Sequence, residues 1–104
     1  MDNLKFDDGK PQLTLVPSQI IYDIAAVRQF GVVKYKDRDS WRKVSIQRYR
    51  DALLRHIYAY LAEPDGTDEE SGLTHLSHVA CNVAFLCDLE KHKHKQEFKV
   101  DDVP

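Results

Sequence analysis

Residues 70 to 86, ESGLTHLSHVACNVAFL, place polar side chains that could bind a ligand in a segment otherwise typical of a buried helix. At about 100° per residue, Asn82 falls within about 20° of His75, and Ser71 and His78 fall within about 60° of it. The four side chains therefore form one narrow polar stripe. Because each buried polar group without a partner costs about 1–3 kcal/mol, the stripe favours a ligand-binding slot. Two histidines satisfied by neighbouring groups are the alternative.

The segment IQRYRDALLRHIYAYLAE adds positive charge that could hold a phosphate. Arg48 and Arg55 are seven residues apart, so they lie on the same side of a helix, beside His56. Guanidinium groups bind phosphates through paired, charge-assisted hydrogen bonds, and the tyrosines nearby could line a base pocket. For either arginine taken alone, a solvated edge paired with Asp51 explains its presence as well.

Two further segments offer groups suited to a nucleotide. In KYKDRDSW, Lys34 is a point charge, and Tyr35 and Trp41 are surfaces on which a base could stack. Lys10 brings a second lysine from the N-terminal stretch. A tryptophan in a connector also commonly covers a core, so Trp41 is the weakest of these indications.

The positions of glycine, proline and turn-forming residues predict which helices and connecting segments carry these groups. Residues 1–16 contain Gly9, Pro11 and the alternation of Leu13 with Leu15, which predicts an extended arm. Residues 17–91 form the helical domain, and residues 92–104 are a polar tail. Within the domain we expect helices over 17–31, ending on Gly31, over about 45–63, and over about 72–91.

These elements predict an all-α fold, a small bundle of about three main helices with an extended N-terminal arm. The second and third helices are expected to pack antiparallel, because the loop PDGTDEES is short and Ala52 and Ala59 permit close approach. Three helices with this much apolar surface leave a stripe uncovered. We therefore expect oligomerisation, as a dimer or higher homo-oligomer, to complete the bundle.

Composition limits the classes of function. The chain has 104 residues, 31% charged and 42% apolar, with a net charge of −2. This balance gives no field for a nucleic-acid polymer or a membrane surface, and no apolar run is long enough to span a bilayer. No signal-peptide pattern is present, so a cytoplasmic location is expected. Cys81 and Cys87, six apart in one helix, are expected to be small core residues and not a disulfide.

The sequence resembles a known family of proteins. The segments DGKPQLTLVP, FGVVKY, RYRDALLRH, SGLTHLSHVACN and FL follow the pattern of phage dATP/dGTP diphosphohydrolases, between about Asp8 and Asp88. That family is similar to the MazG-like all-α nucleoside triphosphate pyrophosphohydrolases. The resemblance implies a helical oligomer that converts purine (deoxy)nucleoside triphosphates to monophosphates and diphosphate, using Mg²⁺ or Mn²⁺ in the host cytoplasm.

The resemblance also implies roles for individual residues. Phosphates would be bound by Lys10, Lys34, Arg48 and Arg55, with Tyr35, Trp41, His56 and Asn82 completing the substrate site. Glu70, His75 and His78 would be the catalytic groups at the metal or the attacking water, and Glu70 with His75 would be metal ligands.

One departure keeps other functions open. MazG-type chemistry resembles a two-metal reaction run by helical E-x-x-E and E-x-x-D pairs, and neither pair stands on the expected helices. Hard cations prefer such oxygen ligands. A non-catalytic protein that sequesters a host cyclic nucleotide immune signal is therefore the first alternative. A structural helical interaction module is the second, and it leaves the two arginines unexplained.

Overall fold

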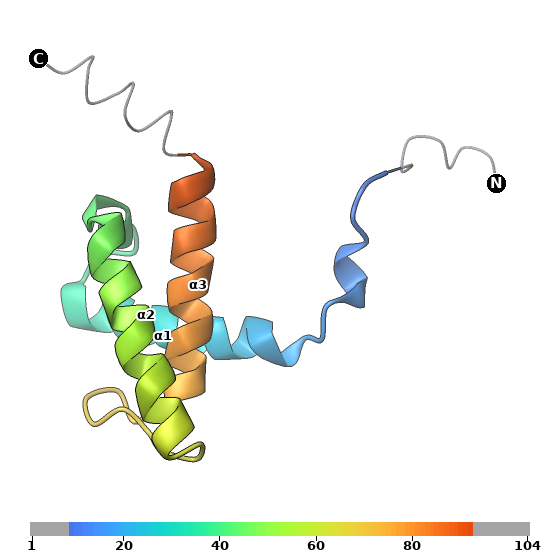
Figure 1. Cartoon of the computed structure of the whole chain (residues 1–104). Coiled ribbons are helices and arrows are strands. Elements are labelled where there is room, and N and C mark those ends of the chain that lie inside the picture. Colours follow the sequence, from blue (N-terminus) through green and yellow to red (C-terminus); the bar gives the residue numbers. More distant parts are fainter. Residues whose placement is uncertain (1–8, 93–104) are drawn as a thin grey trace, which may run out of the picture.

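The structure is a computed structural model, which describes residues 9–92 and has three α-helices within them. These are α1 (Gln19–Tyr35), α2 (Ile46–Ala62) and α3 (His75–Lys91), with short 3-10 turns η2 (Leu13–Leu15) and η3 (Ser40–Lys43). The helices α2 and α3 run antiparallel, and α1 crosses them and packs on α3 (Figure 1). The predicted all-α class and the antiparallel pair are confirmed, and both Ala52 and Ala59 are half-buried.

Two helix starts are fixed by side-chain caps. The Ser45 hydroxyl accepts a hydrogen bond from the Arg48 N–H at 3.3 Å, so α2 begins where the sequence predicts. The Thr74 hydroxyl accepts one from the Ser77 N–H at 3.1 Å, so α3 begins at His75 and not near Gly72. Gly72 instead takes a left-handed conformation, with φ of 75°, in the loop before α3.

The end of α1 differs from the prediction. Gly31 does not end the helix, which continues for one more turn to Tyr35. A glycine inside a helix costs only about 1 kcal/mol relative to alanine, which tertiary packing readily offsets. The helix ends where Lys36 adopts the left-handed conformation, with φ of 56°. Lys34 and Tyr35 therefore project from the last turn of α1 and not from a connector.

The N-terminal residues that the structure describes carry exposed apolar side chains. Leu13 and Leu15, whose alternation suggested extended backbone, lie in the 3-10 turn η2 and are 80% and 76% exposed. This stretch and the start of α1 project away from the α2–α3 pair (Figure 1). No helix among the described residues is long and apolar enough to cross a membrane.

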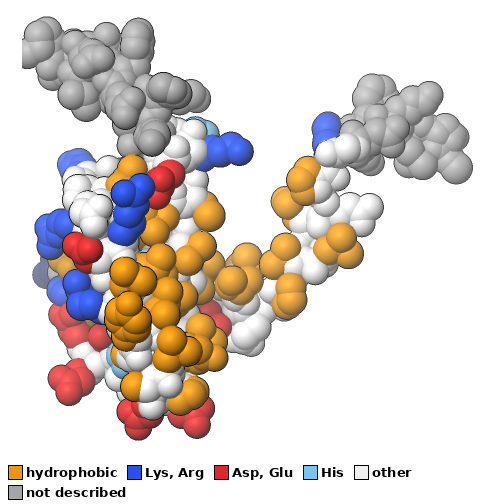
Figure 2. Space-filling model, viewed as in Figure 1, with side chains coloured by type: hydrophobic (Ala, Val, Ile, Leu, Met, Phe, Trp, Pro, Cys, Tyr) orange, Lys and Arg blue, Asp and Glu red, His pale blue; other side chains and the backbone are white. Residues whose placement is uncertain are grey.

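The interior is small. Among residues 9–92 the fully buried apolar side chains are Cys81 and Leu89, and the buried polar ones are Ser77 and Asn82. Cys87, expected in the core, is exposed. Apolar side chains gather over one face of the molecule (Figure 2). Leu54, Tyr58 and Leu61 of α2 are among the exposed large apolar side chains. The chain thus buries little apolar surface by itself.

Candidate functional site

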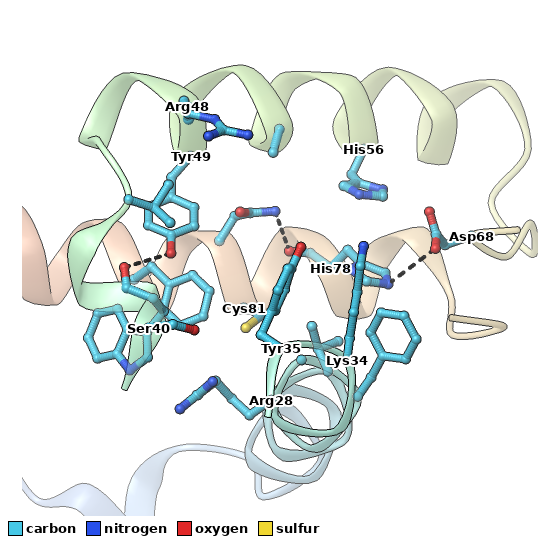
Figure 3. Close-up of a pocket in the computed structure, with 18 of the residues that line it drawn as sticks. Arg28, Lys34, Tyr35, Ser40, Arg48, Tyr49, His56, Asp68, His78 and Cys81 are labelled. Carbon is cyan, nitrogen blue, oxygen red and sulfur yellow. Dashed lines mark hydrogen bonds and ion pairs between the residues drawn. The ribbon is translucent and has the colours of Figure 1, made fainter. Parts of the chain in front are cut away.

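An open cavity of about 460 Å³ lies between the three helices and η3 (Figure 3). The helical repeat explains why polar groups meet there. His78, Asn82 and Phe85 follow the i, i+4, i+7 spacing along α3, so they line one face of that helix. Nine residues predicted from the sequence line the cavity: Lys34, Tyr35, Trp41, Arg48, Arg55, His56, Glu70, His78 and Asn82.

Two predicted residues do not line the cavity. Lys10 is exposed in the N-terminal stretch, which projects away from the helices that form the cavity (Figure 1). His75 lies behind the lining, where its Nδ1 is 3.0 Å from Nδ1 of His56. The structure therefore brings His75 to the site as a support for His56.

One end of the cavity is aromatic, and we define this aromatic end by Trp41, Tyr49 and Phe85. The Trp41 and Phe85 rings stack with centroids 4.7 Å apart, and the Tyr49 ring is 4.8 Å from that of Phe85. The Tyr49 hydroxyl donates a 2.7 Å hydrogen bond to the Trp41 carbonyl, which fixes η3 against α2. Burial raises the pKa of Tyr49 to about 12, so this donor keeps its proton at neutral pH.

Arg28 of α1 also lines the cavity at this end. Its guanidinium carbon lies 5.6 Å from the Phe85 ring centroid and 5.8 Å from that of Trp41, within the range of cation–π attraction. Arg28 also donates a hydrogen bond to the Arg38 carbonyl. The aromatic end is thus held together by contacts from α1, α2, α3 and η3.

The other end is the imidazole end, which we define by the cavity-lining pair His56 and His78. His75 lies outside the lining, with its ring centroid 5.2 Å from that of His56. The His56 and His78 rings stack with centroids 4.6 Å apart and an interplanar angle of 11°. Burial lowers the pKa of His56 and of His78. Charge repulsion from His78 lowers the pKa of His56 further, and repulsion from His75 acts on both in the same direction. The Nδ1–Nδ1 hydrogen bond between His56 and His75 requires one nitrogen to lack a proton, so these two cannot both be imidazolium.

Asp68 holds the imidazole end in place from the loop before α3. Its Oδ2 accepts hydrogen bonds from the backbone N–H of Ser71 at 2.9 Å and of Glu70 at 3.1 Å. The Ser71 hydroxyl lies 2.7 Å from Nε2 of His78, and Asp68 Oδ2 lies 4.0 Å from that nitrogen. Burial alone would raise the pKa of Asp68, but the Ser71 hydrogen bonds and His78 outweigh it and lower the pKa.

The cations at the cavity differ in whether they are already paired. Lys34 forms a 2.6 Å ion pair with Glu70, and this hydrogen bond raises the pKa of Lys34. Within residues 9–92, no carboxylate lies within ion-pair distance of Arg48 or Arg55. Asp51, considered as a partner for them, instead accepts a 3.1 Å hydrogen bond from Gln47. Both arginines can therefore bind an anion without first breaking an ion pair to any of the residues from 9 to 92.

The two expected metal ligands each have another partner. Glu70 pairs with Lys34, and His75 pairs with His56. Between residues 9 and 92, no group of three His, Cys, Asp or Glu side chains is arranged to hold a metal ion. The described residues therefore do not fit a magnesium or manganese site by themselves.

Sequence reasoning missed several cavity residues, among them Arg28, Tyr49, Asp68 and Phe85. Arg28 shares a helix face with Gly31 and Tyr35, at i+3 and i+7, but this relation appears only when the helix is extended beyond Gly31. Tyr49 lies between two arginines in the sequence, which identifies it only as one of several tyrosines that could line a base pocket. Asp68 is positioned by a loop whose conformation has no helical period, so nothing in the sequence distinguished it from its acidic neighbours.

Comparisons with known proteins find matches over most of the chain. The family model described as "dATP/dGTP diphosphohydrolase, N-terminal" matches residues 2–99. A dATP/dGTP diphosphohydrolase of Salmonella phage PMBT28 is 35% identical over 86 residues, which cover 83% of this chain and 29% of the relative. The chain thus spans less than a third of the length of this relative. No solved structure matches the chain.

Proposed function

This chain belongs to the dATP/dGTP diphosphohydrolase N-terminal family, and we propose that its cavity binds a purine deoxynucleoside triphosphate. One observation carries the proposal: the same cavity has an aromatic end and the two arginines Arg48 and Arg55, which have no carboxylate partner among residues 9–92. Aromatic rings offer a surface for a flat base, and free guanidinium groups bind phosphate oxygens.

Each part of the ligand has a place in this proposal. The base lies at the aromatic end against Tyr49, Phe85 or Trp41. The phosphates lie toward Arg48 and Arg55, and Lys34 joins them once its ion pair with Glu70 opens. Because that pair is more than a third exposed on both sides, opening it costs little.

The second part of the proposal is hydrolysis of the bound triphosphate to monophosphate and diphosphate. Mg²⁺ or Mn²⁺ would supply charge stabilisation at the phosphates. Since the described residues lack a set of three metal ligands, the carboxylates for such an ion would come from outside them, from a partner copy or from Asp7 and Asp8. The described residues would bind and orient the substrate.

The same observation favours a second candidate function. A cavity with free arginines and no metal-ligand cluster among the described residues suits a protein that retains an intact nucleotide, including a cyclic nucleotide signal of the host. Both functions require the same binding event and differ only in the fate of the ligand.

One experiment separates the two. The purified chain is incubated with dATP, dGTP, dCTP or a cyclic dinucleotide, with and without Mn²⁺, and the solution is chromatographed before and after heat denaturation. Monophosphate in solution identifies a hydrolase, whereas intact nucleotide released only by heat identifies sequestration. If all ligands stay free and intact throughout, the nucleotide proposal is wrong.

We also propose that the chain acts as a homo-oligomer in the cytoplasm of the host. Leu13, Leu15, Ile21 and Tyr22 are each more than 60% exposed, and Tyr58 and Leu61 of α2 are similarly exposed. Apolar side chains in such number on a small domain are typical of a surface covered by another chain. Sedimentation at micromolar concentration tests this, and a stable monomer would rule it out.

A further inference from the structure

The N-terminal stretch contains twelve consecutive residues without a charged side chain. They run from Pro11 to Tyr22 with the sequence PQLTLVPSQIIY, in a chain of which 31% is charged, and we call residues 11–22 the uncharged segment. All twelve residues are exposed. Charged residues are typical of a solvated surface, whereas the centre of a protein–protein interface is depleted of them. The segment therefore has the composition of an interface.

Large apolar side chains make up half of the uncharged segment. Their exposed fractions range from 42% to 80%, and they are Leu13, Leu15, Val16, Ile20, Ile21 and Tyr22. The last three lie in the first turn of α1, whose later residues line the cavity. Between Gln19 and Phe30 this helix has neither proline nor glycine, which are common causes of a sharp kink. The first turn of α1 therefore stays away from the α2–α3 pair, as Figure 1 shows.

A second exposed apolar surface lies on α2. Leu54, Tyr58 and Leu61 are 49%, 67% and 66% exposed, and their i, i+4, i+7 spacing places them on one face of the helix. We call these three residues the α2 stripe. Leu54 follows the cavity-lining Ala52 by two residues, about 200° around the helix, so the stripe faces away from the cavity. A partner on the stripe would leave the cavity open to its ligand.

We propose that the uncharged segment of one copy packs on the α2 stripe of a second copy, and that the second copy returns the same contact. This inference rests on the proposed homo-oligomer and adds which two surfaces meet. A reciprocal contact covers both surfaces of both copies and closes the assembly as a two-fold dimer. Packing of stripe against stripe would instead leave both uncharged segments in water, and packing of segment against segment would leave both stripes in water.

The apolar area of the two surfaces is enough for a stable dimer. The nine apolar side chains of the segment and the stripe are between 42% and 80% exposed. Each offers on the order of 100 Å² of apolar surface. Together they match the roughly 800 Å² per partner that a stable interface of standard size buries. The stripe alone offers much less than this area, which favours burial of the two surfaces together.

The first test changes one residue of each surface. Sedimentation equilibrium gives the dimer dissociation constant of the wild type, Leu15→Asp, Tyr58→Asp and the control Val33→Asp. Val33 is 75% exposed, as Leu15 is 76% exposed, but it belongs to neither surface. Because burying a charge in an apolar interface is unfavourable, Leu15→Asp and Tyr58→Asp should each raise the dissociation constant by roughly tenfold or more. Val33→Asp should dimerise like the wild type.

The second test identifies which surfaces meet. Cys87→Ser removes the exposed native thiol and leaves the buried Cys81, in two chains that carry either Leu15→Cys or Tyr58→Cys. Each chain alone, and an equimolar mixture left to exchange subunits, is treated with a flexible bismaleimide linker. Mass spectrometry identifies the products. The proposed dimer should give a cross-linked product only in the mixture, and that product should join the two different chains.

The outcomes are distinct. Cross-links in the Tyr58→Cys chain alone would show stripe against stripe, and cross-links in the Leu15→Cys chain alone would show segment against segment; either result overturns the inference. So does an oligomer that gives no cross-link in any sample, or one that both aspartate variants leave unchanged. The proposed homo-oligomer survives all of these results. A wild type that stays monomeric at micromolar concentration overturns the homo-oligomer and the inference with it.

Discussion

The aromatic end and the imidazole end of the cavity stand on the same helices, but different forces hold them. Trp41, Tyr49 and Phe85 are joined by ring contacts and by the hydrogen bond from the uncharged Tyr49 hydroxyl to the Trp41 carbonyl. These contacts do not depend on protonation near neutral pH. His56 and His78 stack on each other and are hydrogen-bonded to His75 and Ser71 respectively, and the direction of these hydrogen bonds depends on tautomer and charge. The comparison indicates a rigid end suited to a base and a titratable end suited to an anion.

The largest effect is expected from breaking the aromatic end. Phe85→Ala removes the ring that touches both Trp41 and Tyr49. Truncating a packed phenylalanine to alanine typically costs about 3–5 kcal/mol, and the partial exposure of Phe85 places it at the lower limit. Urea denaturation measures this loss. A change below about 1 kcal/mol would show that the rings do not hold η3 to the bundle.

Acid is expected to act on the imidazole end alone. Burial lowers the pKa of His56 and His78, so the unfolded chain binds more protons than the folded chain as pH falls through the ordinary histidine range. The free energy of unfolding should therefore decrease from pH 7.5 toward the lowered pKa values. Denaturation at several pH values measures the slope, and His56→Gln with His78→Gln should flatten it. An equal slope in this double variant would place the titrating groups elsewhere.

The affinity for phosphate is expected to change with pH in the direction opposite to stability. An anion favours protonated imidazole, so its binding should take up protons, and affinity should rise as pH falls from 8 to 6. Calorimetry in buffers of different ionisation enthalpy counts these protons. Tyr49 should not contribute, since its pKa of about 12 keeps it neutral throughout.

A smaller loss of stability is expected from removing the Tyr49 hydroxyl at the aromatic end. Tyr49→Phe keeps the ring next to Phe85 and deletes only the hydroxyl that donates to the Trp41 carbonyl. The expected loss is about 1 kcal/mol, with no change in the pH slope of stability. A variant as stable as the wild type would show that η3 is held by stacking alone.

The smallest effect is expected at Gly31, between the two ends. A Cβ at this position would meet no atom within 4 Å, and its backbone is helical. Gly31→Ala should therefore stabilise α1 by about 0.5–1 kcal/mol, through its greater helix propensity. The same methyl group extends into the cavity, so a loss of nucleotide affinity without loss of stability would place the ligand against α1.

The sequence predicted the fold and part of the cavity because both follow from helical periodicity. The stripe of His78 and Asn82 and the pair Arg48 and Arg55 each lie on one helix, so their spacing sufficed to place them. Asp68 escaped prediction because its position depends on a loop held by its own hydrogen bonds. The expected metal ligands Glu70 and His75 each have another partner, Lys34 and His56, a relation that no sequence spacing reveals.

The central claim is that Arg48 and Arg55 bind the phosphates of a nucleotide in this cavity. Calorimetric titration with dGTP tests it most directly, using Arg48→Ala/Arg55→Ala and the control Arg50→Ala. Arg50 stands on the same helix but pairs with Glu90 at 3.0 Å and does not line the cavity. Loss of two charge-assisted hydrogen bonds, at about 1.5–3 kcal/mol each, should weaken binding at least a hundredfold. Arg50→Ala should bind like the wild type, and equal affinity in all three proteins would contradict the account.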